Sequence, residues 1–202
     1  MRKGKIYRYD DPFWSTFYRP NLDLYPEKLA HQFAKAEMLG EEFKLEYKRF
    51  ENAYFLEKEK LGFTKMEKIK DKEEIILIQN IASMNFHFAA GRLSNKDVSL
   101  LEMDTATVWF SDQSLIKQLN SRLGDPKFNI DSYTWVPEAI FSADKIYRGD
   151  DGRLIVVKNI DGRLFEVIFK YLPNKKESFV ISARWTSEKK LRSEAKKYEV
   201  VR

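Results

Sequence analysis

The spacing of apolar residues changes once along this chain, near Asp104, and this change limits the possible folds more than any other feature. Before residue 104, apolar residues recur at steps of three and four, which is the period of one face of an α-helix. After it, short runs of alternating apolar and polar residues are separated by turn residues, which is typical of strands. The sequence therefore predicts an α+β protein in which long helices precede a small antiparallel sheet.

Two helices are predicted in residues 26–103. The first begins at Pro26, because proline suits the first turn of a helix, and ends at Gly62 after about 35 residues. The second runs from Ile69 to about Gly91. We expect the two to form an antiparallel hairpin, since the apolar stripe of a helix must be buried against another element. The stripe of the first helix consists of Leu29, Phe33, Ala36, Gly40, Phe43, Tyr47, Phe50 and Tyr54.

Residues 1–25 differ from both halves. They are rich in Tyr, Phe and Trp and are interrupted by Pro12 and Pro20, which prevent a continuous helix. We therefore predict an irregular arm. Its aromatic side chains are expected to pack against the same chain or against a partner, because so large an apolar surface is unfavourable in water.

Residues 104–202 are predicted to form a separate basic domain that folds on its own. A strand is expected at 105–110, because Thr, Val, Trp and Phe favour extended backbone. Ser111 or Asp112 can cap the short helix that follows, and a second short helix is expected to end near Phe141.

The rest of this domain is predicted to be a four-stranded antiparallel meander. Asp161-Gly162 lies between two apolar runs and is a strong hairpin signal. A last basic helix is expected to begin after Thr186 or Ser187 and to end near Lys197. The four strands are predicted at residues 145–148, 154–160, 164–172 and 179–185.

The net charge of +5 is unevenly distributed. Residues 1–104 hold 18 Lys and Arg against 18 Asp and Glu, whereas residues 105–202 hold 18 against 13. The excess is concentrated in residues 145–202, with 15 basic and 8 acidic side chains. Such an asymmetry favours binding of a polyanion such as RNA or DNA, and the alternative is ordinary solubilising charge on an exposed sheet face.

Several classes of site and location are disfavoured by what the sequence lacks. It contains no cysteine, which excludes disulfides and thiolate metal sites, and its two histidines, His31 and His87, have no second ligand at the helical spacing of a metal site. We therefore predict no metal and no cofactor. No apolar run approaches the ~20 residues needed to span a bilayer, so we predict no membrane association and a cytoplasmic location.

The polar side chains of the last two predicted strands provide the candidate site. In the last strand, alternation places Val180, Ser182 and Arg184 on one face, which we expect to be exposed. The preceding strand contributes Glu166 and Lys170 to that face. Arg and Lys there can hold phosphate oxygens, and the alternative is a solvated face with cross-strand Glu–Lys pairs. The predicted cluster consists of Lys158, Lys170, Ser182 and Arg184.

Several short motifs in the second half of the chain follow one another in a recognisable order. They are a helix bearing Lys117, then Pro137-Glu138-Ala139-Ile140, then Asp144-Lys145-Ile146-Tyr147, and a last strand ending in Arg184-Trp185-Thr186-Ser187. This order resembles the phage-associated branch of the barnase/EndoU/colicin/RelE-like nuclease group. The resemblance implies a small α+β domain with a four-stranded antiparallel sheet, often fused to phage head or portal modules.

For an active member, the resemblance implies metal-independent cleavage of RNA. A general base takes the proton of the ribose 2′-hydroxyl, an acid protonates the leaving oxygen, and cations stabilise the phosphorane. Glu138 and Glu166 are the candidate general bases. The catalytic candidates are Arg184, Lys170 and Glu138. The nucleic-acid-binding candidates are Lys117, Lys158, Lys170, Ser182, Arg184 and Thr186.

The chain departs from this group in one respect. Members of the phage branch usually carry a histidine a few residues after the position of Lys117, and residues 105–202 contain no histidine. RelE-like members are similar in relying on Arg, Lys and Tyr instead. The departure favours a protein that keeps the fold without the catalytic chemistry.

Three functions stay open from the sequence. We predict a phage- or prophage-derived protein that is either a virion or minor-head component or a nucleic-acid-binding module. The alternative is an active metal-independent ribonuclease of the toxin type. Expected partners are RNA or DNA, together with phage head or portal proteins or another copy of the chain bound through residues 1–61. The expected location is the cytoplasm or the virion.

Overall fold

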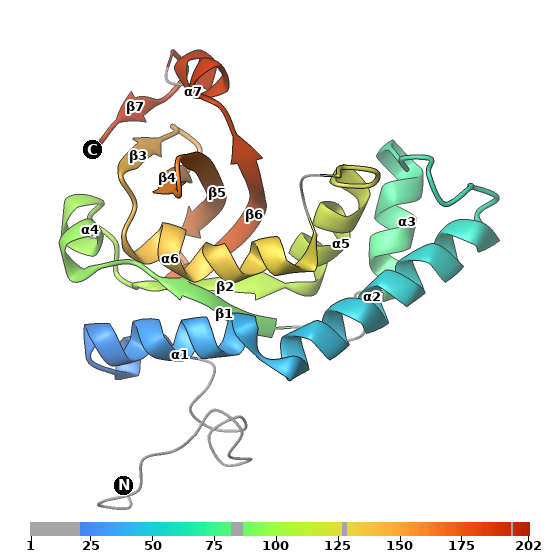
Figure 1. The fold of residues 1–202 in the computed structure, drawn as a ribbon, viewed down its shortest axis with the longest axis horizontal. Coiled ribbons are helices and arrows are strands. Elements are labelled where there is room, and N and C mark those ends of the chain that lie inside the picture. Colours follow the sequence, from blue (N-terminus) through green and yellow to red (C-terminus); the bar gives the residue numbers. More distant parts are fainter. Residues whose placement is uncertain (1–20, 82–86, 127–128, 195) are drawn as a thin grey trace, which may run out of the picture.

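The computed structural model describes residues 21–81, 87–126, 129–194 and 196–202, so most of the predicted aromatic arm lies outside the described residues. The predicted α+β class is confirmed (Figure 1). The helices are η2 (Leu22–Leu24), α1 (Glu27–Leu39), α2 (Glu41–Lys60), α3 (Asp71–Ile81), α4 (Asn95–Leu100), α5 (Asp112–Ser121), η4 (Ile130–Trp135), α6 (Val136–Phe141) and α7 (Glu188–Glu194). The strands are β1 (His87–Arg92), β2 (Thr107–Ser111), β3 (Lys145–Arg148), β4 (Arg153–Ile160), β5 (Arg163–Leu172), β6 (Glu177–Thr186) and β7 (Glu199–Val200).

The described strands form one seven-stranded sheet in the order β1-β2-β6-β5-β4-β3-β7. β3 to β6 are neighbours and run antiparallel, and Asp161-Gly162 makes the tight turn between β4 and β5 with both residues at positive φ. The prediction of a four-stranded sheet was nevertheless wrong in extent. β2 joins β6 in parallel at Trp109 and Phe179, and β1 and β7 extend the two edges.

Strand β1 corrects the predicted second helix, which was expected to reach Gly91. The helix ends at Ile81, and the run that begins at His87 pairs with β2 as an antiparallel strand. Periodicity alone does not separate a buried strand from a helical segment when an apolar run is short. This strand also means that residues 26–103 are not purely helical.

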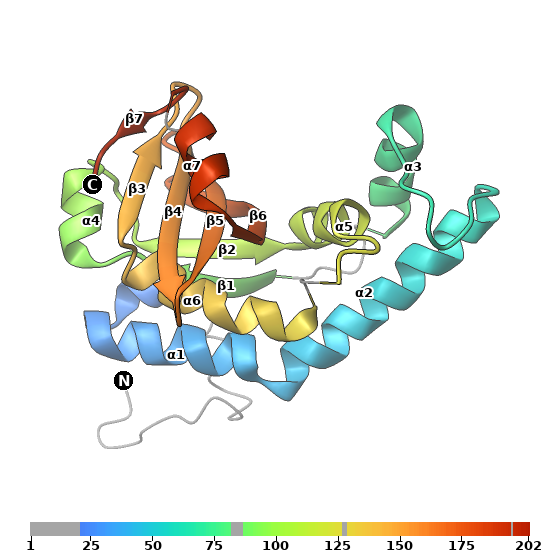
Figure 2. The ribbon, with the colours of Figure 1, turned by 45° about the horizontal axis from the view of Figure 1, so that its top comes forward.

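The predicted single long helix is broken at Gly40. This residue has extended backbone, with φ −72° and ψ 156°, so α1 ends at Leu39 and α2 begins at Glu41. The two helices meet at an angle (Figure 2), and α2 then packs against α3. The prediction treated Gly40 as a point of close helix approach, whereas its backbone separates two helices.

The break also changes which residues of the first helix are buried. In α2 the predicted stripe is confirmed, because Phe43, Phe50 and Tyr54 are fully buried. In α1 the buried apolar positions are Ala30, Ala34 and Met38, while Leu29 is 38% exposed. A stripe drawn continuously through Gly40 therefore fits α2 and misses the inner face of α1.

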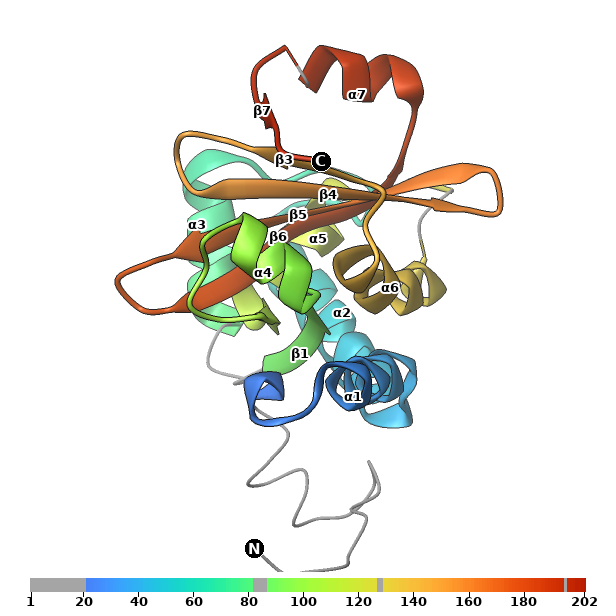
Figure 3. The same ribbon diagram turned by 90° about the vertical axis from the view of Figure 1, so that its left-hand side faces the viewer.

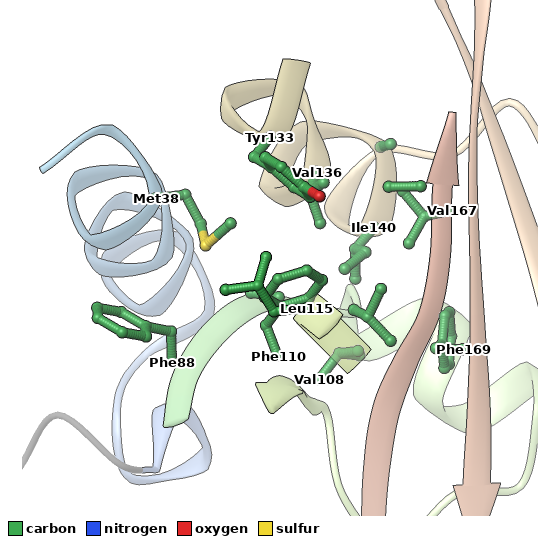
Figure 4. Close-up of a cluster of buried hydrophobic side chains, with 14 of the residues drawn as sticks. Met38, Phe88, Val108, Phe110, Leu115, Tyr133, Val136, Ile140, Val167 and Phe169 are labelled. Carbon is green, nitrogen blue, oxygen red and sulfur yellow. The ribbon is translucent and has the colours of Figure 1, made fainter. Parts of the chain in front are cut away.

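The main hydrophobic core fills the space between α2, α5 and α6 and the inner face of the sheet (Figure 4). Aromatic rings from three elements meet there, with Phe43 5.7 Å from Tyr133 and 5.4 Å from Phe88 between ring centroids. Ser111 caps α5, as predicted, and holds Leu115 and Ile116 against this core. Core residues thus come from both sides of residue 104, whereas the sequence predicted that 104–202 folds on its own.

The opposite, outer face of the sheet is covered by two different helices. α1 packs Ala30 and Ala34 against Ala89 of β1 and Trp109 of β2. At the other end, α7 lies across the outer face of the β3–β6 strands (Figure 3). It buries Leu191, and the strand side chains that it covers are Tyr147, Ile155, Val157, Leu164 and Ile168. This face was predicted to be exposed, and α7 is the reason that it is not.

A bulge in β6 changes the predicted alternation of its side chains. Ile168 is paired with Ser182 while the next residue, Phe169, is paired with Val180, so Ile181 is an extra residue. Val180 therefore lies in the main core together with Ala183, instead of sharing a face with Ser182. Ser182 and Arg184 keep the outer face that alternation predicts for them.

Candidate functional site

The candidate site lies on the outer face of β5 and β6, beneath α7. Glu166 of β5 is directly opposite Arg184 of β6, and cross-strand partners share a face. Ser182 follows two residues before Arg184 on the same side of β6. The C-terminal end of α5 and the inner side of α7 add further charged groups, so four elements build the site.

At its centre, one guanidinium nitrogen faces two carboxylates. Arg184 Nη2 is 2.5 Å from Glu166 Oε1 and donates a hydrogen bond of 2.7 Å to Glu194 Oε1. The Glu166 side chain is completely buried, whereas those of Arg184 and Glu194 are 18% and 19% exposed. Arg184 and α7 therefore stand between Glu166 and the solvent.

Burial raises the pKa of Glu166 to about 7. The positive charge of Arg184 opposes this rise, and the nearby carboxylate of Glu194 adds to it. A carboxyl group in this state exchanges protons near neutral pH, which is the property required of a general base or acid.

Two more cations surround this pair. Arg122, at the end of α5, donates a hydrogen bond of 2.8 Å from Nη2 to Ser182 Oγ, and burial together with the charge of Arg184 lowers its pKa. Lys190 of α7 also has a lowered pKa, first because of burial and then because of Arg184. The site thus gathers three cations and two carboxylates. Because there are three cations and one of the two carboxyl groups has a pKa of about 7, the site carries a net positive charge that can attract an anion.

Two surface depressions flank the site. One, of about 550 Å³, lies beside the C-terminal end of β6 and includes Thr186, Trp185 and Lys190, with Arg163 stacked 3.9 Å above the Trp185 ring. The other, of about 360 Å³, lies on the solvent side of α7. It is lined by Glu188, Lys189, Arg192, Ser193 and Lys196.

The predicted cluster of four residues is gathered only in part. Ser182 and Arg184 lie together, and Lys170 shares their face further along β5, opposite Arg153. Lys158 lies on the other face, because it is opposite the core residue Phe165. Its ammonium pairs at 3.1 Å with the carboxylate of Asp144, which directly precedes β3. Lys158 is therefore separated from Arg184 by the sheet.

Glu138 lies away from Arg184, on α6, where it joins α6 to α1. Its carboxylate contacts His31 Nε2 at 3.2 Å and Lys35 Nζ at 3.3 Å and accepts a 2.7 Å hydrogen bond from Ser142. Burial raises the pKa of Glu138, but these hydrogen bonds outweigh it and the net pKa lies below its usual value. The structure places Glu138 in an interhelical contact, and Lys117 is exposed on α5.

Sequence reasoning missed three members of the site, Arg122, Lys190 and Glu194. Arg122 and Lys190 come from helices whose packing on the sheet is a tertiary feature without a local signal. Glu194 was recognisable only as an acid within the predicted basic helix. Glu166 was among the candidate bases, and the structure places it at the centre.

No family model matches this chain, and no solved structure matches it. The resemblance to the nuclease group therefore stays a prediction from the sequence motifs. Within the described residues, no three His, Cys, Asp or Glu side chains are grouped in a way that could hold a metal ion. The helices of the described ranges include none long and apolar enough to cross a bilayer.

Proposed function

We propose that this protein binds RNA or DNA through its phosphates, at the surface formed by the solvent side of α7. The observation that carries the proposal is the depression on this helix, where Lys189, Arg192 and Lys196 are exposed and Glu188 is the acid among the lining residues. Exposed cations grouped on one surface neutralise neighbouring phosphates along a strand and release their counterions. Because phosphates are the same at every nucleotide, the binding is expected to be tolerant of sequence.

The test is the salt dependence of binding to a single-stranded RNA oligomer, measured by fluorescence anisotropy. The double variant Arg192→Gln/Lys196→Gln should weaken binding and reduce the slope of log affinity against log salt by about 1.4, since single strands lose ~0.7 per phosphate contact. The matched control is Lys175→Gln/Lys176→Gln, which removes two charges from the exposed turn between β5 and β6. Equal effects of both variants, or no binding at low salt, would contradict the proposal.

A second candidate function is metal-independent cleavage of RNA, and the raised pKa of Glu166 is the observation that favours it. A buried carboxyl with a pKa of about 7 suits the general base that takes the 2′-hydroxyl proton. Arg184 and Arg122 are then the cations that stabilise the developing charge on the phosphate. Because Glu166 is fully covered, cleavage requires that α7 moves first.

Cleavage is tested with purified protein and labelled RNA in the presence of EDTA. If Glu166 is the base, Glu166→Gln should slow cleavage by about 100-fold or more, and Arg184→Ala should lower the rate by a similar factor. Glu138→Gln is the matched control, because Glu138 lies in the α1–α6 contact. No cleavage by the wild type would remove this candidate and leave the binding proposal standing.

A further inference from the structure

Helix α7 is held to the sheet by few contacts. It has seven residues, and Leu191 is the one among them that is buried. The other firm contact is the ion pair between Glu194 and Arg184, and Lys145 and Glu188 form a looser one at 3.8 Å between exposed side chains. A short helix with one apolar anchor is expected to open locally at a low free-energy cost.

Some of the buried polar atoms under α7 lack a well-aligned hydrogen bond from the described residues. Both carboxylate oxygens of Glu166 and Oε2 of Glu194 are buried without a well-aligned hydrogen bond from any described residue. Arg184 is the cation that both carboxyl groups share, and the nearby charge of Glu194 helps to raise the pKa of Glu166. When Glu166 is ionised, the two carboxylates repel each other. The closed position of α7 is therefore stabilised less than the number of charges suggests.

We propose that α7 is a displaceable cover, in which the Glu194 carboxylate occupies the place on Arg184 that a backbone phosphate of the bound strand takes when the helix moves away. The proposal rests on the nucleic-acid binding proposed above and adds its regulation. A phosphate presents two oxygens to a guanidinium, as a carboxylate does, so it can replace Glu194 without changing the type of contact.

The charges on α7 make such an exchange reasonable. Its solvent side carries Lys189 and Arg192, and Lys196 follows two residues after its end; these cations attract the strand to the helix before Arg184 is accessible. Beneath the helix, Arg122 lies near Arg184, whose charge is one cause of the lowered pKa of Arg122. A phosphate that enters there contacts these two cations, while Glu194 is released to water and Lys190 moves away with the helix. Opening also uncovers Glu166, so binding and any cleavage are coupled.

The first measurement compares two single substitutions that each remove one negative charge. Glu194→Gln removes the competing carboxylate and should tighten binding of a single-stranded RNA oligomer by about tenfold, equivalent to ~1.4 kcal/mol. Glu199→Gln removes one negative charge from the exposed strand β7, outside the proposed binding surface, and it should change affinity by about twofold at most. Equal gains in affinity from both variants would mean that only long-range charge affects binding, and would contradict the proposal that α7 is a displaceable cover.

The second measurement follows the helix itself, by hydrogen exchange of peptides that contain α7. Added RNA should make the amides of α7 exchange faster, while those of α5 stay unchanged. Without RNA, the Glu194→Gln variant should already show part of this increase in the exchange rate of the α7 amides. Protection of α7 by RNA would mean that the strand binds to the closed helix, which contradicts displacement and supports the simpler surface binding. If RNA does not bind at all, the proposed function itself fails, and this result is distinct from both.

Discussion

Burial disfavours the charged form of Glu166, the positive charge of Arg184 favours it, and burial has the larger effect. Its folded-state pKa of about 7 lies above the usual value of 4.5, so it belongs to the class of groups that stabilise the fold while they are protonated. That stability is complete below the unfolded pKa and is lost as pH rises through the folded pKa. The relevant window therefore runs from about pH 4.5 to about pH 7.

We predict that Glu166→Gln abolishes this loss, because glutamine is neutral at every pH. The free energy of unfolding of the variant, minus that of the wild type, should rise by on the order of 3 kcal/mol between pH 4.5 and pH 8. Urea unfolding at several pH values gives this difference, and groups unaffected by the change cancel in it. A difference that stays constant with pH would show that Glu166 remains ionised in the folded protein.

At the scale of elements, α2 carries the aromatic contacts that join the N-terminal helices to the sheet. Phe43 is fully buried among Phe88, Phe110 and Tyr133. We predict that Phe43→Asp lowers the free energy of unfolding by about 4 kcal/mol or more, since it leaves an unpaired charge and a void in the core. Leu45→Asp, two residues away, should change it by less than about 0.5 kcal/mol, because Leu45 is 66% exposed.

Thermal and urea unfolding of the two variants provide the comparison. Similarly small losses in both variants would indicate that α2 tolerates a charge on either side and that the aromatic cluster is unimportant. A large loss from the Leu45 variant alone would instead indicate that the exposed side of α2 is covered in solution.

The elements also show where sequence reasoning succeeds. The Asp161-Gly162 hairpin and the Ser111 cap were predicted because local backbone geometry demands particular residues there. The break at Gly40, the strand β1 and the extra residue at Ile181 were not, because each depends on packing against distant segments. The site follows the same rule: Arg184 and Glu166 come from predicted strands, whereas Arg122 reaches them from a separate helix.

For the whole molecule, the decisive question is whether residues 105–202 fold without the rest. The structure gives a reason to expect that they do not, because their core is completed by Phe43, Phe50 and Phe88. We predict that the 105–202 fragment shows no cooperative urea transition, while a chain beginning at residue 21 does. Circular dichroism and tryptophan fluorescence provide the measurement, and a cooperative transition in the short fragment would support two independent domains.

The parallel pairing of β2 with β6 affects the order in which the sheet forms during synthesis. Trp109 has left the ribosome long before its partner Phe179 is made, and the sheet cannot close until β6 has been added. Contacts between segments far apart in the chain slow folding, because the intervening loop must be ordered before the contact forms. During that interval the apolar sides of α1, β1 and β2 are covered only by earlier segments of the chain, such as α2 and α5. We expect the nascent chain to depend on chaperones until its last strands emerge.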